Sequence, residues 1–292
     1  MYNIMQVAFL NPNTRPPPAV NADLSPLSTA NVITLLTDFG LKDGNVGVMK
    51  GVIWRIAPQA KIADLSHLIG AQNVAEAALI LSRSAPYFPP GAIHVSVVDP
   101  GVGTARRPIA ARIGLHYYVC PDNGILSMLL NRAEAENWPV HIIHADQPRY
   151  WLPEISPVFH GRDIFAPLAA HLVNGVPLPE LGRGVDDPVR LRLPLPDHTD
   201  YGWKGEVIHI DHFGNISTNI QRAQLGQPAN VRVQLCGAAI EGLVSTFGER
   251  PSGELVALYG STGSLIICVV NGSAAQRLGA SPGDPVEVKV RP

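Results

Sequence analysis

From residue 32 onward, short apolar segments alternate with segments whose apolar residues recur at helical spacing. Residues 32–36 are typical of a buried strand, and residues 46–56 carry the pattern of an amphipathic helix. Further strands are expected at 61–65, 93–98, 117–120 and 140–143, and further helices at 74–84 and 164–173. This alternation predicts an α/β domain over residues 32–175.

The pattern changes after residue 175. Residues 176–200 are rich in proline and lack periodicity, which predicts a linker between domains. Beyond it, short runs rich in Val, Ile and Leu are separated by Gly, Pro and Asn, which predicts a β-barrel over 201–292. Residues 1–31 are expected to form a flexible extension. The predicted fold class is therefore α/β, with an N-terminal, mostly parallel-sheet domain and a smaller C-terminal β-barrel domain.

Composition favours a globular protein that binds a small molecule. Of the 292 residues, 46% are apolar and 16% charged, which is enough to bury a sizeable core. The net charge is −2 and the basic residues form no block, which argues against binding to nucleic acid or to an anionic membrane. No segment approaches the roughly 20 apolar residues of a membrane span. We expect a cytoplasmic protein.

The three cysteines, Cys120, Cys236 and Cys268, are far apart in the sequence and show no zinc-binding spacing. Their odd number gives no disulfide framework. We expect all three to be small buried core residues in a reducing compartment, and we expect no metal site.

Polar residues collect where the predicted strands end, and ligands of open α/β sheets bind at the carboxyl ends of strands. The ends carry Thr-Asp-Phe-Gly at 37–40, Asp-Leu-Ser-His at 64–67, Asp-Pro-Gly-Val-Gly at 99–103 with Arg106, and Pro-Asp-Asn-Gly at 121–124. Each string alone is also an ordinary turn former. Four of them on one edge of a sheet favour a pocket. None is a phosphate-binding glycine loop.

Two later strings have similar local alternatives. In Phe-His-Gly-Arg-Asp at 159–163, Asp163 could simply cap a helix that follows, leaving His160 in a loop. Residues 210–215, Ile-Asp-His-Phe-Gly-Asn, are typical of a hairpin corner.

Taken together, these strings resemble the SAM hydroxide adenosyltransferase family, relatives of the enzymes that attack the same carbon of S-adenosylmethionine (SAM) with halide. The resemblance runs from about residue 33 to the C-terminus. The matching strings lie at 37–40, 64–67, 98–103 with Arg106, 121–124, 159–167, 211–215, 260–263 and 271–275.

The resemblance implies a homotrimer in which SAM binds between the N-terminal domain of one subunit and the C-terminal domain of its neighbour. By position, Asp99, Arg106 and His160 match the family's water-activating residues. The resemblance also implies five substrate-binding residues: Asp38 for the ribose diol, Asp211 and Ser261 for the methionine end, and Asn215 with the backbone near Asn271 for adenine.

The implied reaction is hydrolysis of SAM to adenosine and L-methionine by activated water or hydroxide, with SAM as substrate and without a cofactor. Two alternatives remain. A halogenase would deliver chloride or fluoride to the same carbon, but Asp99 argues for hydroxide because burying a carboxylate beside a halide is costly. A sensor would bind SAM or adenosine without cleaving it, yet binding alone does not require Asp99, Arg106 and His160 together.

Overall fold

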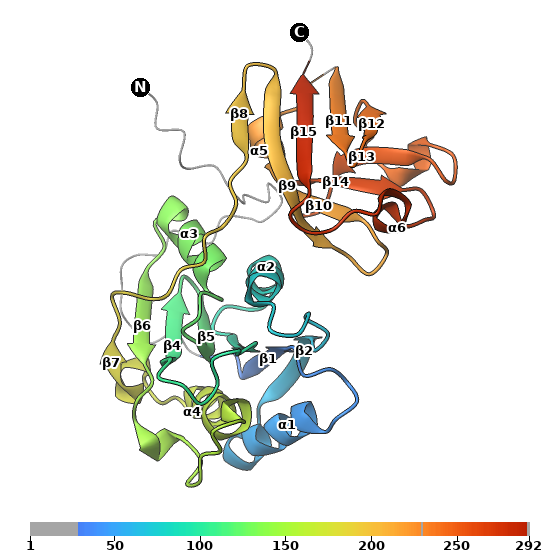
Figure 1. Ribbon diagram of the computed structural model, residues 1–292. Coiled ribbons are helices and arrows are strands. Elements are labelled where there is room, and N and C mark those ends of the chain that lie inside the picture. Colours follow the sequence, from blue (N-terminus) through green and yellow to red (C-terminus); the bar gives the residue numbers. More distant parts are fainter. Residues whose placement is uncertain (1–28, 229, 291–292) are drawn as a thin grey trace. The chain divides into compact units, whose positions relative to one another are not determined.

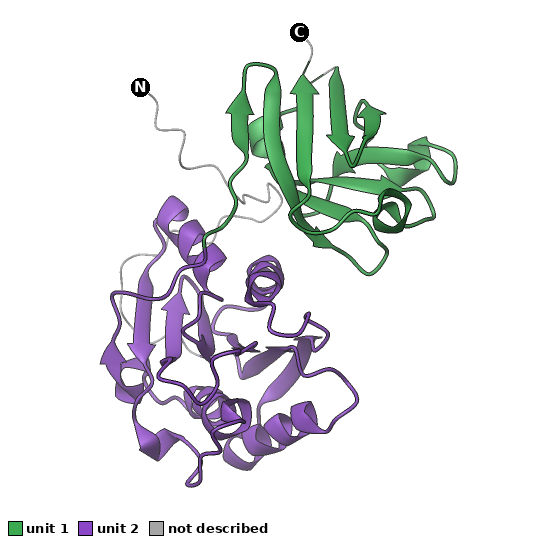
Figure 2. Cartoon of the chain, viewed as in Figure 1, with its two compact units in different colours: residues 1–15, 192–292 green, residues 16–191 purple. Residues whose placement is uncertain are grey.

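The computed structural model describes residues 29–228 and 230–290, so nearly all of the predicted extension 1–31 lies outside the described residues. The chain divides into two compact units, one ending at Leu191 and the other beginning at Arg192 (Figure 2). This division falls inside the predicted linker 176–200. Part of that segment is ordered structure of the first unit, because a 3-10 turn spans Leu178–Leu181 and the short strand β7 (Arg183–Gly184) joins its sheet.

The first unit is built on a seven-stranded sheet in the order β2-β1-β3-β5-β4-β6-β7 (Figure 1). Neighbours from β2 to β5 pair in parallel, and the remaining pairs are antiparallel. Besides β7, its strands are β1 (Val32–Thr37), β2 (Lys61–Ser66), β3 (Ile93–Val97), β4 (Pro108–Ile113), β5 (His116–Pro121) and β6 (Val140–His144). The predicted α/β fold class is confirmed. Strand β4, whose six residues are all buried, is not among the strands expected from the sequence.

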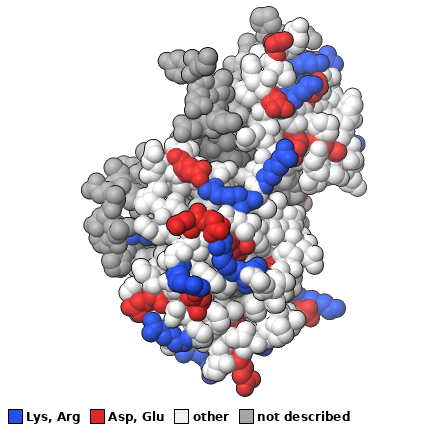
Figure 3. All heavy atoms as spheres, turned by 60° about the vertical axis from the view of Figure 1, so that its left-hand side comes forward, with Lys and Arg blue, Asp and Glu red and all other residues white. Residues whose placement is uncertain are grey.

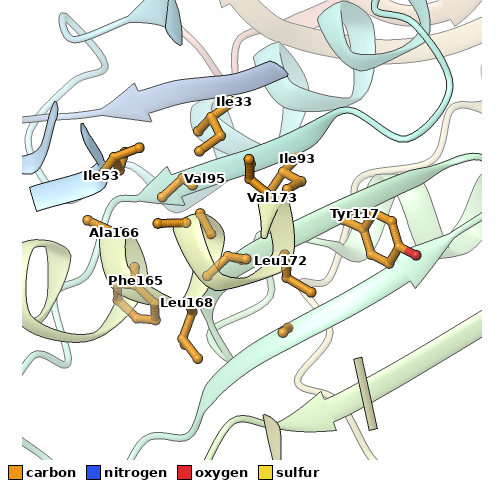
Figure 4. Packing of buried hydrophobic residues seen from close by; sticks show 14 of the residues in the cluster. Ile33, Ile53, Ile93, Val95, Tyr117, Phe165, Ala166, Leu168, Leu172 and Val173 are labelled. Carbon is orange, nitrogen blue, oxygen red and sulfur yellow. The ribbon is translucent and has the colours of Figure 1, made fainter. Parts of the chain in front are cut away.

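Two pairs of helices cover the sheet, α1 (Asn45–Ile56) with α4 (Ala166–Val173) and α2 (Val74–Ser84) with α3 (Ser127–Glu136), on opposite faces (Figure 1). Short 3-10 turns lie at Ala85–Tyr87 and Pro148–Tyr150. The α1/α4 side holds the main core, a cluster that contains Leu168, Leu172 and Val173 of α4 together with Ile33, Ile93 and Val95 of the strands, and Val173 lies beside Ile93 (Figure 4). Full burial of each such side chain contributes about 1.5–3 kcal/mol.

A π-helical turn, Gly161–Phe165, precedes α4 in place of a regular first turn. Pro167 explains it, since a proline has no N–H to donate to the carbonyl four residues earlier. That carbonyl, of Asp163, instead accepts the N–H of Leu152 at 2.9 Å, and the Ala166 N–H donates to Gly161. The predicted helix 164–173 is therefore divided, and its first turn is wide.

The second unit is a nearly closed antiparallel barrel with strand order β12-β11-β15-β9-β10-β14-β13 and β8 paired to β9. Its strands are β8 (Asp197–Thr199), β9 (Gly202–Ile210), β10 (Ile216–Gln221), β11 (Val231–Leu235), β12 (Ala238–Glu241), β13 (Leu255–Tyr259), β14 (Ser264–Val269) and β15 (Pro285–Val290). Short helices lie at α5 (Arg222–Leu225) and α6 (Ala274–Leu278), with a 3-10 turn at Phe247–Glu249. Apolar and polar residues alternate along β11, so Val231, Val233 and Leu235 face inward and are buried. The Val244 N–H donates to the Ala257 carbonyl at 3.0 Å and brings the barrel edges together.

Among the helices of the described residues, none is long and apolar enough to cross a membrane. Cys120 and Cys268 are buried as expected. The expectation for Cys236 is wrong, because this residue is exposed in the turn between β11 and β12 with a φ of 46°.

A buried histidine makes the stability of the first unit dependent on pH. His94 is fully buried, its Nδ1 lies 2.8 Å from the Thr34 hydroxyl, and its Nε2 lies 3.4 Å from His116. Burial, and then the neighbouring His116, lowers the pKa of His94 from 6.5 to about 3. The folded protein therefore resists a proton that the unfolded chain accepts below pH 6.5.

We predict that the free energy of unfolding falls as the pH drops from 6.5 through the folded pKa of about 3. His94→Phe keeps a ring between Phe88 and Tyr118 but cannot titrate, so its stability should change less steeply over this window even if the variant is less stable overall. Urea unfolding at a series of pH values measures both slopes. Equal slopes for the two proteins would contradict the prediction.

Candidate active site

Arg106 joins Asp99 and His160 into one cluster at the carboxyl edge of the parallel strands. Asp99 follows β3, Arg106 precedes β4, and His160 comes immediately before the π-helical turn. The Arg106 Nε lies 2.9 Å from both Asp99 carboxylate oxygens, and Nη2 bonds one of them as well. The same Nη2 lies 2.8 Å from Nδ1 of His160, 54 residues further along the chain. Three residues predicted together are therefore in direct contact.

The cluster is shielded from solvent, with side-chain exposure of 5% for Asp99 and 9% for Arg106. The guanidinium also lies over the Phe165 ring, 5.2 Å from its centroid. Burial, followed by the positive charge of Arg106, lowers the pKa of His160 below 6.5. A guanidinium only donates hydrogen bonds, so His160 Nδ1 accepts, and the neutral ring carries its proton on Nε2.

Asp163 anchors the turn that carries His160. Its side chain is fully buried and accepts the Ser156 N–H at 2.8 Å and the Arg162 Nε at 2.5 Å. Gly161 beside it packs closely, because a Cβ there would lie 3.3 Å from the end of the Phe39 ring and 3.4 Å from the Met49 sulfur. The sequence interpretation of Asp163 as a simple helix cap missed this anchoring role.

Asp38 lies at the same edge of the sheet. β1 and β3 are parallel with Thr37 opposite Val97, so Asp38 and Asp99, which follow these strands within two residues, emerge at the same edge of the sheet. The Asp38 Oδ2 accepts the Gln72 N–H at 2.8 Å. The adjacent Phe39 ring packs edge-on against Phe159, with 5.8 Å between centroids, and thereby reaches the turn that bears His160.

In the second unit, Asp211 and Asn215 form the corner of the β9–β10 hairpin, as the sequence predicts. Asp211 Oδ1 accepts the N–H groups of Phe213 and Asn215, both at 2.9 Å, and Oδ2 accepts the Asn215 side-chain amide at 2.8 Å. The Gly214 carbonyl accepts the Ala275 N–H at 3.0 Å. The corner is therefore internally rigid and joined to the start of α6.

The remaining predicted residues lie in turns of the same unit. Ser261 is exposed in the turn between β13 and β14, which closes with the Gly263 N–H donating to Gly260 at 2.9 Å. Asn271 is exposed between β14 and α6 with a φ of 55°, a left-handed conformation. A Cβ on Gly214 would lie 2.0 Å from Ser273 Oγ, so the hairpin corner packs closely against the segment that follows Asn271.

The Pro-Asp-Asn-Gly string at 121–124 has a structural role. Asp122 is buried and accepts the Arg107 Nε at 2.8 Å and the Val189 N–H at 2.9 Å. The Asn123 amide donates to the Val98 carbonyl at 2.8 Å and so fixes the backbone just before Asp99. No signal in the local sequence identifies these partners, since they lie 15 to 67 residues away.

The charge distribution agrees with a small-molecule site. On the face shown in Figure 3, acidic and basic side chains are intermixed among uncharged residues. Over residues 29–228 and 230–290, no group of three or more His, Cys, Asp or Glu side chains is arranged to hold a metal ion.

Comparison with known proteins defines the class. The model of the SAM hydroxide adenosyltransferase N-terminal domain matches residues 33–182, and that of the C-terminal domain matches residues 205–287. The chain therefore belongs to the SAM hydroxide adenosyltransferase family.

Several similar proteins have a named activity or a solved structure. The chain is 40% identical over 261 residues to the (R)-S-adenosyl-L-methionine hydrolase of Salinispora tropica, covering 88% of this chain and 97% of that protein. It is 42% identical over 264 residues to the enzyme of the same name from Thermus thermophilus, with coverages of 88% and 98%. A fluorinase of an Actinoplanes species is 29% identical over 271 residues, with coverages of 81% and 90%. An uncharacterised conserved protein from Thermotoga maritima has a solved structure with a TM-score of 0.82 and 37% identity, covering 88% of this chain and 99% of that chain.

The cluster geometry predicts how His160 titrates. Arg106→Met removes the cation that lowers the pKa of His160, so this pKa should rise from its wild-type value, while burial still acts against protonation. Side-chain NMR of labelled histidine measures the titration and should also show the Nε2–H tautomer in the wild type. As a control, Arg132→Met removes a cation that pairs with Glu136 on α3 and should leave His160 unchanged. An unchanged pKa in Arg106→Met would contradict the described contact.

Proposed function

We propose that this enzyme hydrolyses SAM to adenosine and L-methionine by in-line attack of water or hydroxide on C5′ of the ribose. The observation that carries the proposal is the direct contact of Asp99, Arg106 and His160 within a chain of the SAM hydroxide adenosyltransferase family. The named hydrolases among its relatives match it over 88% of its length, which supports the same reaction here.

In the proposed mechanism, Asp99 holds the attacking water and takes up its proton. Arg106 fixes both carboxylate oxygens in place, so the acceptor is oriented before the substrate arrives. The neutral His160 completes the hydrogen-bond network and offers its Nε2–H as a donor to the incoming oxygen. A new C5′–O bond forms as the C5′–S bond breaks, and its electron pair returns to sulfur. Methionine leaves as a neutral thioether, so the departure requires no metal.

We assign substrate binding to residues of both units. Asp38 can accept two hydroxyl hydrogens and is assigned to the ribose diol, with Asp211 and Ser261 holding the methionine end. The amide of Asn215 can both donate and accept, which suits adenine together with the backbone at Asn271. Asp211 is engaged by its own loop, yet carboxylate oxygens have further lone pairs for an ammonium group. The relatives are named for the R epimer at sulfur, and we propose the same preference here.

We also propose a cytoplasmic homotrimer with its sites at the subunit interfaces, as the family resemblance implies. Because one relative is named a fluorinase, halogenation of the same carbon is the alternative reaction. Asp99 argues against halogenation, because its carboxylate would repel a halide in the position assigned to water.

Incubation with SAM should yield adenosine and L-methionine in equal amounts, with activity unchanged by a chelator. In labelled water the new 5′-hydroxyl should carry solvent oxygen, and C5′ should invert, as a single displacement requires. Chromatography with mass spectrometry identifies the products and the label. Retention at C5′ would contradict direct attack by water, and a halogenated nucleoside at modest chloride would favour the halogenase. SAM that is bound but left intact would favour the sensor.

Asp99→Asn should lower kcat by about 10²–10⁴-fold, because an amide cannot take the proton from water. Arg106→Ala and His160→Ala should also lower kcat far more than SAM affinity, and the combined loss should be less than additive if the three act as one unit. Steady-state kinetics together with calorimetric SAM binding separates the two effects. A rise in KM at constant kcat would contradict the assignment to water activation.

A further inference from the structure

A second polar network lies next to the proposed site, beginning at Thr37, the last residue of β1. The Thr37 hydroxyl oxygen lies 2.9 Å from His67 Nδ1, and the Phe39 N–H donates to the same oxygen at 3.2 Å. On the other side of the imidazole, Nε2 lies 3.1 Å from Asp64 Oδ1. The other oxygen of Asp64 accepts the Lys50 ammonium at 2.7 Å. We call this series, Thr37 to His67 to Asp64 to Lys50, the Thr37 chain.

The proton positions along the Thr37 chain follow from its donors and acceptors. Because the Thr37 oxygen accepts from Phe39, its own proton is available for His67 Nδ1. The tautomer in which Nδ1 accepts this proton carries its own proton on Nε2, 3.1 Å from Asp64 Oδ1. Burial of the Asp64 carboxyl acts to raise its pKa, but the bonds from Lys50 and His67 outweigh it and leave the pKa below its usual value. The carboxylate is thus held in its charged form as the acceptor.

The Thr37 chain contains the residue types of a nucleophilic triad, but its burial excludes that role. Thr37 is fully buried, and its hydroxyl is engaged by both Phe39 and His67. A nucleophile must present its oxygen to the substrate. The His67 side chain is 3% exposed and Asp64 is 40% exposed, so the chain opens to solvent at its Lys50 end, away from Thr37.

The Thr37 chain instead holds the turn on which Asp38 lies. Phe39 is bonded to the Thr37 hydroxyl, and the Gly40 N–H donates to the His67 carbonyl at 2.8 Å, so the backbone after Asp38 is fixed at two successive N–H groups. Gly40 has a φ of 69°, which turns the chain at this point. Asp38 itself remains half-exposed, with one oxygen bonded to Gln72.

A bulge in β2 lies next to the residues of the Thr37 chain. The register of β1 with β2 shifts so that Leu35 pairs with Asp64 but Leu36 pairs with Ser66, leaving Leu65 as an extra residue. Bulges of this kind redirect the side chains that follow them and are frequent beside active sites. Here the bulge lies between Asp64, which is in β2, and His67, which directly follows β2. Both residues take part in the Thr37 chain.

We propose that His67 is a positioning residue that acts through Thr37 to hold Asp38 in place for the ribose diol. This inference rests on the proposed function, in which Asp38 binds the ribose. The described residues provide a matched comparison, since Thr34 on the same strand bonds a second buried histidine, His94, at 2.8 Å. That pair lies within the sheet, three residues before the turn, and contacts no residue assigned to the substrate.

The test compares adenosine binding by calorimetry in substituted proteins whose melting temperatures are also measured. Thr37→Val keeps the shape but loses the hydroxyl and should weaken adenosine binding by about tenfold, the effect of one or two lost hydrogen bonds. Thr37→Ser retains the hydroxyl and should stay within about twofold of wild type. Likewise, His67→Leu should lose affinity, and His67→Asn should restore part of it, because its amide can occupy the place of Nδ1.

Thr34→Val is the matched control, and it should lower the melting temperature while leaving adenosine affinity unchanged. A wild-type affinity in both Thr37→Val and His67→Leu would overturn the positioning role, as would an equal loss in Thr34→Val. Asp38→Ala distinguishes the assignment of Asp38 to the ribose from the positioning role of the Thr37 chain. If it binds adenosine normally, the ribose assignment itself fails. If it loses adenosine while Thr37→Val does not, only the role of the Thr37 chain fails.

Discussion

The arrangement of the first unit depends on one buried cation. Arg106 has a side chain only 9% exposed, and a guanidinium removed from water is costly unless its donors are matched by acceptors. Asp99 provides two oxygens, His160 provides a ring nitrogen, and Phe165 provides an aromatic face. Together with Arg106 itself, these groups come from three separate segments. The charge can therefore be buried only when the end of β3, the start of β4 and the turn before α4 meet correctly.

The surrounding structure keeps those segments in place. Asn123 bonds the carbonyl of Val98 and so fixes the main chain next to Asp99. On the opposite side, the missing N–H of Pro167 leaves the carbonyl of Asp163 free for Leu152, and the Asp163 side chain bonds Ser156. Pro167 in the first turn of α4 thus leaves the Asp163 carbonyl available for Leu152. That bond helps to hold the turn that follows His160. In the proposed mechanism, such an arrangement would hold the acceptor Asp99 and the donor His160 in position before a substrate binds, as a reaction with weakly nucleophilic water requires.

Sequence patterns predicted β1, β3 and β5 well because these buried strands, which pair in parallel, are rich in apolar residues. They failed at β4, where Arg112 interrupts the run, and at α3, whose segment has a polar average composition. The proximity of Asp99 and Arg106 is partly local, since they are seven positions apart. The distant His160 came from the family resemblance, because no periodicity connects residues 54 positions apart. The supporting contacts of Asn123, Asp163 and His67 depend on tertiary packing, and the sequence alone shows only that these residues are polar.

Asp122, Asp211 and Asp38 differ in their exposure and in the partners that already bond their carboxylates. Asp122 is buried, with Arg107 on one oxygen and Val189 on the other, so it serves the fold. Asp211 also forms a turn, but it lies half-exposed at a hairpin corner where a ligand can still reach its oxygens. Among the described residues, Asp38 has one oxygen bonded, to Gln72, and its turn is held by Thr37 and His67. Because this neighbouring network holds the turn, the proposed function can assign the other Asp38 oxygen to the ribose, so that forming a turn and binding a ligand are compatible at one position.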